Sequence, residues 1–140
     1  MNRTPYAISH TLAREEIRAW GCVQGAAAAA PTIPSTVTSG TASSNWMSAL
    51  DNFVSSVAGD ITRSGVGVYT VKFKDSIPVI LNIIPTVWGL DGKPAQPGEY
   101  NASTRVLTFR TWAGATVATD LATTDFVHFS ITGKLVTENA

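Results

Sequence analysis

The sequence predicts an all-β protein, an antiparallel β-sandwich of jelly-roll-like type with an extended N-terminal arm. Runs in which apolar and polar residues alternate recur along the chain, and this two-residue period is typical of strands with one buried face. Stretches rich in Gly, Pro, Asn and Asp separate the runs, as turns do. Short strands at such spacing favour a sandwich or a small barrel. The 140 residues suit one domain, which we place at 17–133, after an arm or short helix at 1–16 and before a tail at 134–140.

The alternating runs place the strands and the core. In the run 66–75, Tyr69, Val71 and Phe73 alternate with Thr70 and two lysines. The run 77–89 is β-branched and apolar, which predicts a strand covered on both faces. We expect strands at 18–25, around 52–57, 60–65, 66–75, 77–89, 104–112 and 125–136, with a turn at 91–101 and a loop at 113–124. The residues expected to be mostly buried are Val71, Phe73, Ile80, Ile83, Leu107, Phe109, Val127 and Phe129.

Residues 26–44, "AAAAAPTIPSTVTSGTASS", differ in composition from the rest. Alanine favours a helix, but Pro31 and Pro34 prevent one from growing. We therefore expect a long loop, which together with residues 1–12 forms an arm that docks on partner chains. The arm residues expected to contact a capsid or another partner are Tyr6, Ile8, Leu12, Ile33 and Val37. Around residues 9–20 the sequence allows a short helix or an extended lead-in.

Charge and cysteine content limit the function classes. Ten basic residues balance ten acidic ones, so we expect neither nucleic acid nor a membrane surface as a partner. The charged fraction of 14% is below the usual ~25%, which favours association with other chains. The single cysteine, Cys22, permits no intrachain disulfide, and the cysteine spacings of zinc sites are absent. No apolar run has the length of a membrane span, and the first residues do not fit a signal peptide.

The stretch "SGVGVYTVKF" contains a Gly-x-Gly pair at Gly65 and Gly67. A dinucleotide-binding loop needs G-x-G-x-x-G and a following helix, and a Walker loop needs G-K-[ST]. Neither pattern is complete, and a strand follows. We interpret the pair as a tight turn in which both glycines adopt positive φ.

Few residues offer catalytic or metal chemistry, and we expect no catalytic residue, no metal and no cofactor. Cys22 could pair with His10 or His128 as a nucleophile, or be a small buried residue on a strand. His128 alternates with core residues, so the outer face or an interface suits it. Asp120 and Asp125 could bind a cation, although aspartates beside a Thr-rich loop are more often turn-formers.

Four tryptophans raise a different possibility, because aromatic faces can stack on sugars. Trp20, Trp46, Trp88 and Trp112 fall at separate strand or loop ends, and core or interface anchoring explains them as well. As interface or glycan candidates we name Trp46, Trp88 and Trp112.

Three segments of the sequence resemble a β-sandwich domain common in tailed-bacteriophage virion proteins, such as tail fibres, short tail proteins and head decoration proteins. They are "IRAWGCVQG", "DNFVSSVAGDITRSGVGVYTVKFKDSIPVI" and "STRVLTFRTWAGATVATDLATTDFVHFSITG". The likeness covers about 17–133 and is carried by the Arg18-Ala19-Trp20 motif, the expected strand at 52–57, the Gly65–Phe73 turn and strand, and the loop 113–120. The stretch 26–34 and the extra residues 58–62 depart from the pattern.

The resemblance implies a non-enzymatic virion protein, assembled in the host cytoplasm, often a homotrimer. The chain has no long repetitive shaft, so a capsid decoration or cement protein fits better than a fibre. Its partners would be the major capsid protein or other virion proteins. The alternative is a module at a tail or fibre tip that binds a host receptor or glycan. An enzyme that uses Cys22 or Asp120 is a more distant reading.

Overall fold

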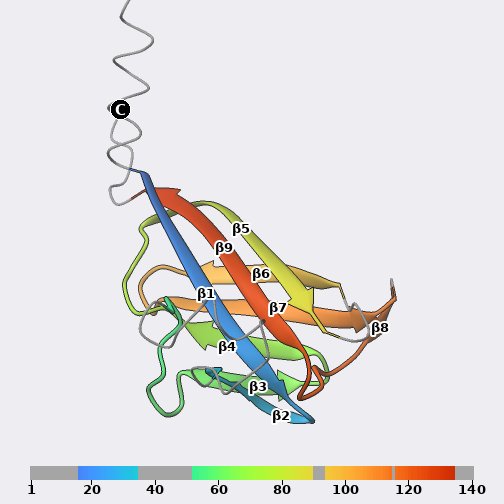
Figure 1. The fold of residues 1–140 in the computed structure, drawn as a ribbon. Helices are drawn as coiled ribbons and strands as arrows, with labels where there is room; N and C mark the ends of the chain where they lie inside the picture. The colour runs from blue at the N-terminus through green and yellow to red at the C-terminus, as the bar shows by residue number, and fades with distance from the viewer. Residues whose placement is uncertain (1–15, 35–51, 90–93, 115, 135–140) are drawn as a thin grey trace, which may run out of the picture.

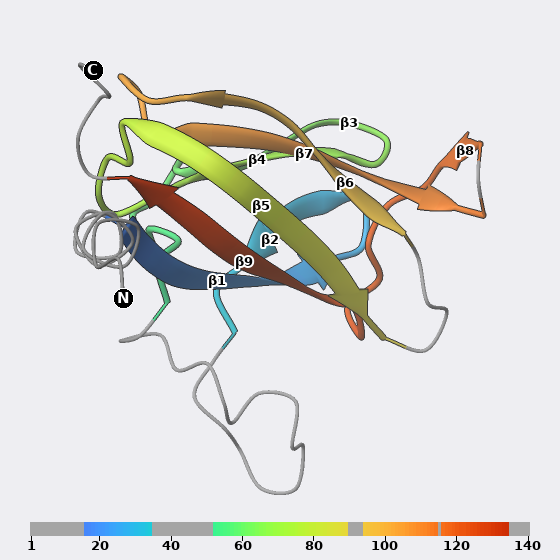
Figure 2. The same cartoon turned by 90° about the horizontal axis from the view of Figure 1, so that it is seen from above.

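The computed structural model describes residues 16–34, 52–89, 94–114 and 116–134. They form two antiparallel sheets packed face to face, a β-sandwich, with the strands of one sheet crossing those of the other (Figures 1 and 2). Sheet A has the strand order β2-β1-β9-β5, and sheet B has the order β3-β4-β7-β6, with β8 paired to β7. The strands are β1 (Glu16–Ala26), β2 (Ala29–Thr32), β3 (Ile61–Gly65), β4 (Val68–Lys72), β5 (Val79–Trp88), β6 (Ala95–Asn101), β7 (Val106–Ala113), β8 (Val117–Ala118) and β9 (Phe126–Lys134).

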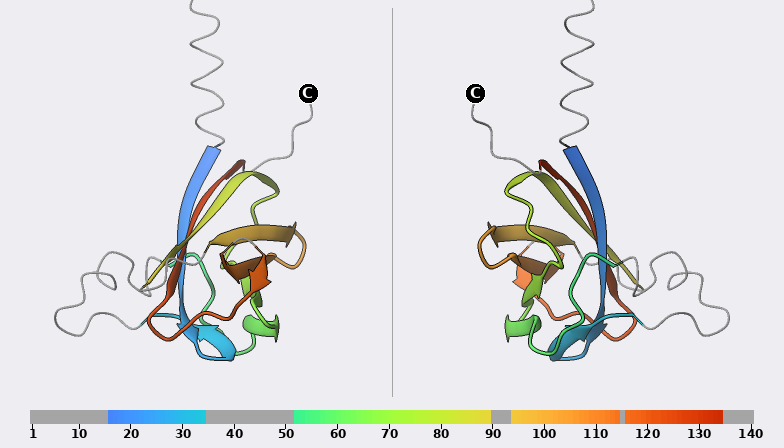
Figure 3. Two further views of the ribbon diagram at one scale, coloured as in Figure 1. Left: turned by 90° about the vertical axis from the view of Figure 1, so that its right-hand side faces the viewer. Right: turned by 90° about the vertical axis from the view of Figure 1, so that its left-hand side faces the viewer.

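The core lies between the two sheets, which Figure 3 shows edge-on as separate layers. Alternate residues of each central strand point into it, which is why the two-residue period predicted them. Aromatic rings fill its centre: Tyr69 stacks on Phe109 at 5.3 Å between ring centroids, and Phe109 meets Phe129 edge-on at 5.1 Å. The fully buried core residues are Val23, Val54, Tyr69, Val71, Phe73, Ile77, Leu107, Phe109, Leu121, Val127, Phe129 and Ile131.

The prediction of the core is confirmed for six of its eight residues, which are all buried. The other two, Ile80 and Ile83, are only partly buried and pack against the core from β5. The prediction that residues 77–89 are covered on both faces is wrong. β5 is an edge strand of sheet A, and its residues alternate between half-buried and exposed.

Three other predicted segments differ from the structure. Within the expected turn at 91–101, residues Ala95–Asn101 form β6, where Pro97 lies beside a register shift at the sheet edge. Within the expected loop at 26–44, residues Ala29–Thr32 form β2, which pairs with the end of β1. Each of the two strands contains a proline, which the edge of a sheet tolerates together with irregular pairing. Residues 52–57 do not form a strand, since Val54 makes only an isolated bridge to Phe73.

Residues 52–55 instead close the open side of the sandwich between β1 and β4. The fully buried Asn52 side chain accepts a hydrogen bond from the Cys22 N–H at 3.0 Å and donates one to the Cys22 carbonyl at 2.6 Å. A few residues on, the Ser55 N–H donates to the Lys72 carbonyl at 2.8 Å. This short segment therefore joins the two sheets.

Proline protects the exposed edges of the described sheets. Of the four strands that end the two strand orders, three contain one: Pro31 in β2, Pro85 in β5 and Pro97 in β6. The fourth, β3, is five residues long. Short edges and prolines prevent another chain from adding a strand. Contacts with other molecules are thus directed to the sheet faces and the loops.

The Gly-x-Gly stretch is the turn between β3 and β4, as predicted. Gly67 has φ of 65°, but the φ of Gly65 is not positive, so the prediction of two left-handed glycines is wrong for Gly65. A Cβ atom at position 67 would lie 2.5 Å from the Thr111 carbonyl oxygen. Position 67 therefore needs glycine both for its backbone conformation and for its close contact with β7.

Candidate functional site

Exposed aromatic and apolar side chains lie on the outer face of sheet A, which is the face away from the core. Cross-strand register places rows of outward-facing side chains over β1, β9 and β5. Outward-facing rows of a solvated sheet are normally polar, as is the row Arg18–Thr132–Asn82. The next three rows are instead rich in apolar and aromatic side chains: Trp20–Ser130–Ile84, Cys22–His128–Thr86 and Gln24–Phe126–Trp88.

A shallow hollow of about 310 Å³ lies in this face. Trp20 on β1 is 55% exposed and Trp88 on β5 is 52% exposed. The Trp88 ring leans edge-on against Phe126, with centroids 6.3 Å apart. We call the hollow the tryptophan groove; its lining residues are Trp20, Ile84, Thr86, Trp88, His128, Phe129 and Ser130.

Cys22 and His128, weighed in the sequence as a nucleophilic pair, are cross-strand neighbours at the floor of this face. The Cys22 Sγ lies 3.9 Å from the His128 Nε2. Burial raises the pKa of the Cys22 thiol to about 12 and lowers the pKa of His128. Both shifts favour the neutral forms, whereas a nucleophilic pair needs a thiolate. Burial of the pair therefore favours the interpretation of Cys22 as a small buried residue on a strand.

Asp120, weighed as a cation ligand, is a structural centre instead. Its carboxylate accepts hydrogen bonds from Arg63 Nε at 3.0 Å and Nη2 at 2.8 Å, from the Gly67 N–H at 2.9 Å and from the Tyr69 hydroxyl at 3.0 Å. The hydrogen bonds from Arg63 are the main reason that the pKa of Asp120 falls to about 2. Asp125 accepts the Ala122 N–H at 2.7 Å, which is the turn-forming role that the sequence suggested.

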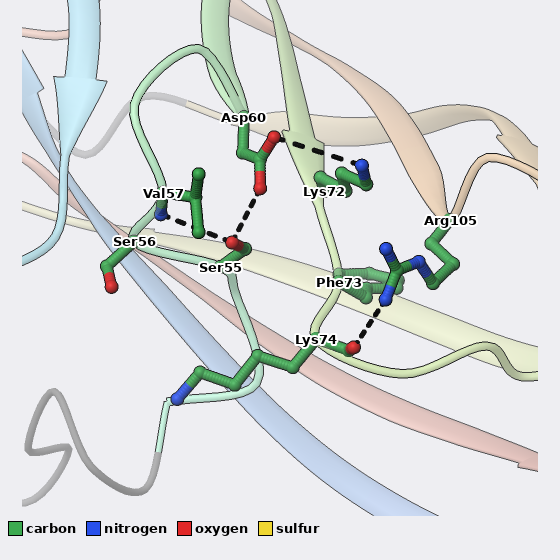
Figure 4. A pocket seen from close by; sticks show the side chains of 8 residues that line it. All are labelled: Ser55, Ser56, Val57, Asp60, Lys72, Phe73, Lys74 and Arg105. Atoms are coloured by element: carbon green, nitrogen blue, oxygen red, sulfur yellow. Dashed lines mark hydrogen bonds and ion pairs between the residues drawn. The ribbon is translucent and has the colours of Figure 1, made fainter.

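A second, polar hollow of about 440 Å³ lies beside the 52–60 segment (Figure 4). Its charged groups bond to one another: Asp60 accepts a hydrogen bond from Ser55 Oγ at 2.6 Å and lies 3.9 Å from Lys72 Nζ. On the other side, Arg105 Nη1 donates to the Lys74 carbonyl at 2.6 Å. These contacts connect the 52–60 segment and the β6–β7 turn to the end of β4. The polar groups around the hollow therefore have a structural role.

Apolar residues are exposed in the β3–β4 turn and in the two-residue strand β8. Val66 in the β3–β4 turn is 54% exposed, and Val117 in β8 is 61% exposed. Both lie where β7 ends, because β8 pairs with Trp112 and Ala113 and the Thr111 N–H donates to the Gly67 carbonyl. We call Val66 and Val117 the valine tips. Val57 is 66% exposed in a turn at the opposite end of β4.

The structure separates the predicted interface and glycan candidates. Trp88 lies in the tryptophan groove, whereas Trp112 is half-buried on β7 in the other sheet. Ile33 packs, partly buried, against the core of its own chain, so its predicted contact with a partner stays a prediction. The remaining candidates lie outside the described residues: Tyr6, Ile8, Leu12, Val37 and Trp46.

The site candidates chosen from the sequence omitted Trp20, which forms one end of the groove. Alternation did place Trp20 opposite Ala19 and Val23 on its strand. Alternation did not reveal that β1 and β5 both pair with β9. This pairing brings Trp20 and Trp88 to one face, although they are 68 residues apart in the sequence.

Among the described residues, no group of three or more His, Cys, Asp or Glu side chains could hold a metal ion. Nor does that part of the chain contain a helix long and apolar enough to cross a membrane. No family model, curated protein or solved structure matches the chain. The function is therefore argued from the surface of the sandwich and from the sequence resemblance.

Proposed function

We propose that this chain is a non-enzymatic structural protein of a tailed-bacteriophage virion, most simply a capsid decoration or cement protein that binds the head shell and neighbouring subunits. The valine tips are the observation that supports this role best. Two β-branched residues, each more than half exposed, lie in the β3–β4 turn and in β8 at one end of sheet B. Burying the exposed half of one such side chain contributes about half of the ~1.5–3 kcal/mol of a full burial, or about 1 kcal/mol.

The edge strands support the same role. Prolines in β2, β5 and β6 and the shortness of β3 disfavour strand addition between neighbouring copies. Many copies can then lie side by side on a shell without forming fibres. Zero net charge and a low charged fraction also favour close association. The virion setting and the homotrimer come from the sequence resemblance.

Light scattering on the purified chain tests the contact surface. We expect a trimer for the wild type and a shift towards monomer for the double variant Val66→Ser, Val117→Ser. Val57→Ser is the matched control, since it removes an equally exposed valine from the other end of the sandwich and should leave the trimer intact. A wild type that stays monomeric at high concentration, or tip variants that assemble like the wild type, would count against the proposal.

The second candidate function is a module at a tail or fibre tip that binds a host receptor or glycan. The specific observation in its favour is the tryptophan groove, which an inert shell subunit does not need. Light scattering does not separate the two candidates, but the location of the chain in a reconstruction of the virion does.

A further inference from the structure

The groove between Trp20 and Trp88 points to a ligand-binding site, and we propose that it takes a neutral oligosaccharide. This inference rests on the second candidate function and names its ligand class, but it does not depend on the assembly role, because the groove belongs to the face of sheet A and the valine tips to the end of sheet B. Three properties of the groove identify the ligand class: its lack of charge, its aromatic ends and its size.

None of the side chains that line the groove carries a full charge. His128 is the titratable one, and burial lowers its pKa and keeps it neutral. Arg18 lies in the row next to Trp20 on the same face, where its charge is offset by the ion pair with Glu16 at 3.2 Å. A charged ligand would lose water on entering and find no counter-charge, which is costly. The groove therefore suits an uncharged ligand.

The arrangement of polar and aromatic groups matches the chemistry of a sugar. A pyranose ring has an apolar C–H face and a rim of hydroxyl groups. Trp20 and Trp88 offer half-exposed rings on the outer two strands. Thr86 and Ser130, both exposed, place hydroxyl groups between them. Such a site combines an apolar surface with a few polar groups that fix the ligand's orientation.

The size of the hollow favours a small ligand. Its volume of about 310 Å³ is at the lower end of the ~300–1,000 Å³ range of small-ligand pockets. A short oligosaccharide fits a hollow of this volume.

Intrinsic tryptophan fluorescence and calorimetry on the full chain test the proposal. The probes are lactose, maltotriose, cellotriose and chitotriose, each titrated to about 10 mM, well above a weak Kd of ~1 mM. Covering about 60 Å² of apolar ring surface contributes about 1.5 kcal/mol at ~25 cal/mol per Å², so Trp20→Ala and Trp88→Ala should each weaken binding about tenfold. Because Trp88 also contacts Phe126, Trp88→Phe keeps a ring there and should retain part of the affinity. Trp112→Ala, on the other sheet, should change nothing.

Sialyllactose provides the test of charge. The uncharged groove predicts that its added carboxylate brings no gain over lactose. The proposal is overturned if none of the neutral probes binds, or if Trp112→Ala weakens binding as much as the groove variants do. It is also overturned if the wild type self-associates through this face, so that Trp20→Ala dissolves the oligomer. In that case a second copy, and not a sugar, occupies the groove.

Discussion

Asp120 holds Arg63, 57 residues earlier in the chain, through two hydrogen bonds of 3.0 and 2.8 Å. The same carboxylate holds the backbone of Gly67 and the hydroxyl of Tyr69, which in turn accepts the Leu121 N–H at 2.7 Å. One side chain thus ties the β3–β4 hairpin to the loop after β8. That connection fixes the end of the sandwich from which the valine tips extend.

Replacing Asp120 by Asn should lower the free energy of unfolding by about 2 kcal/mol near neutral pH, since hydrogen bonds to charged groups contribute about 1.5–3 kcal/mol. The pKa of Asp120 is lowered from 3.8 to about 2 in the folded chain. Its stabilising contribution is therefore complete above pH about 4 and is lost as the pH falls towards about 2. Urea unfolding at several pH values should show the difference between wild type and variant narrowing across that interval.

The control for this measurement is Glu16→Gln. Glu16 pairs with Arg18 at 3.2 Å, but the Arg18 side chain is 72% exposed, and such surface pairs contribute at most about 1 kcal/mol. If Asp120→Asn lowers the free energy of unfolding no more than Glu16→Gln does, the hydrogen bonds to Asp120 are not needed for stability.

Gly67 and Gly59 form a matched pair of left-handed glycines, with φ of 65° and 88°. A Cβ atom at position 59 would meet nothing within 4 Å, whereas one at position 67 would lie 2.5 Å from the Thr111 carbonyl oxygen. Gly59→Ala should cost about 1 kcal/mol for backbone strain alone, and Gly67→Ala clearly more. Thermal unfolding of both variants is the measurement. Equal losses would mean that the turn moves away from β7 at little cost.

The sequence predicted the strands best where one face is buried. Alternation located β4, β7 and β9 because their inward residues, such as Val71, Phe109 and Val127, are mostly apolar. Alternation missed β2 and β6, because Pro31 and Pro97 predict turns when only the neighbouring residues are considered. Both prolines are tolerated because they lie in edge strands. Whether a strand lies at the centre or the edge depends on its partners, which periodicity does not reveal.

The site was less predictable than the fold for the same reason. Trp20 and Trp88 share a face because β9 lies between their strands. Asp120 was visible as a polar residue in a Thr-rich loop, but its partners Arg63 and Tyr69 are on another hairpin. Both arrangements depend on contacts between segments far apart in the chain, and residue type and spacing carry no information on those contacts.

Cys22 should react slowly with thiol reagents in the folded chain. It is 1% exposed, and burial raises its pKa to about 12, so the reactive thiolate is scarce near pH 7. Ellman's reagent should label the single cysteine slowly in buffer and rapidly after unfolding in urea. Rapid labelling of the folded chain that persists below pH about 6 would instead indicate a thiolate–imidazolium pair with His128. That result would support the hypothesis that Cys22 is a catalytic nucleophile.

The N-terminal arm is the predicted anchor of the chain on a shell. The sequence places Ile33 in that arm, but Ile33 packs against the sandwich core. Replacing it would therefore disturb the fold and would not test attachment. Deletion of residues 1–12 avoids this difficulty because β1 begins at Glu16. Deletion of residues 135–140 is the control, since it shortens the other end of the chain.

Co-sedimentation with capsid shells that lack the protein tests the central claim most directly. The wild type and the C-terminal deletion should sediment with the shells. The deletion of residues 1–12 should keep its β-sheet circular dichroism but bind at least tenfold more weakly, a change of about 1.4 kcal/mol or more. A wild type that does not bind the shells, or an arm deletion that binds as tightly as the wild type, would contradict the account.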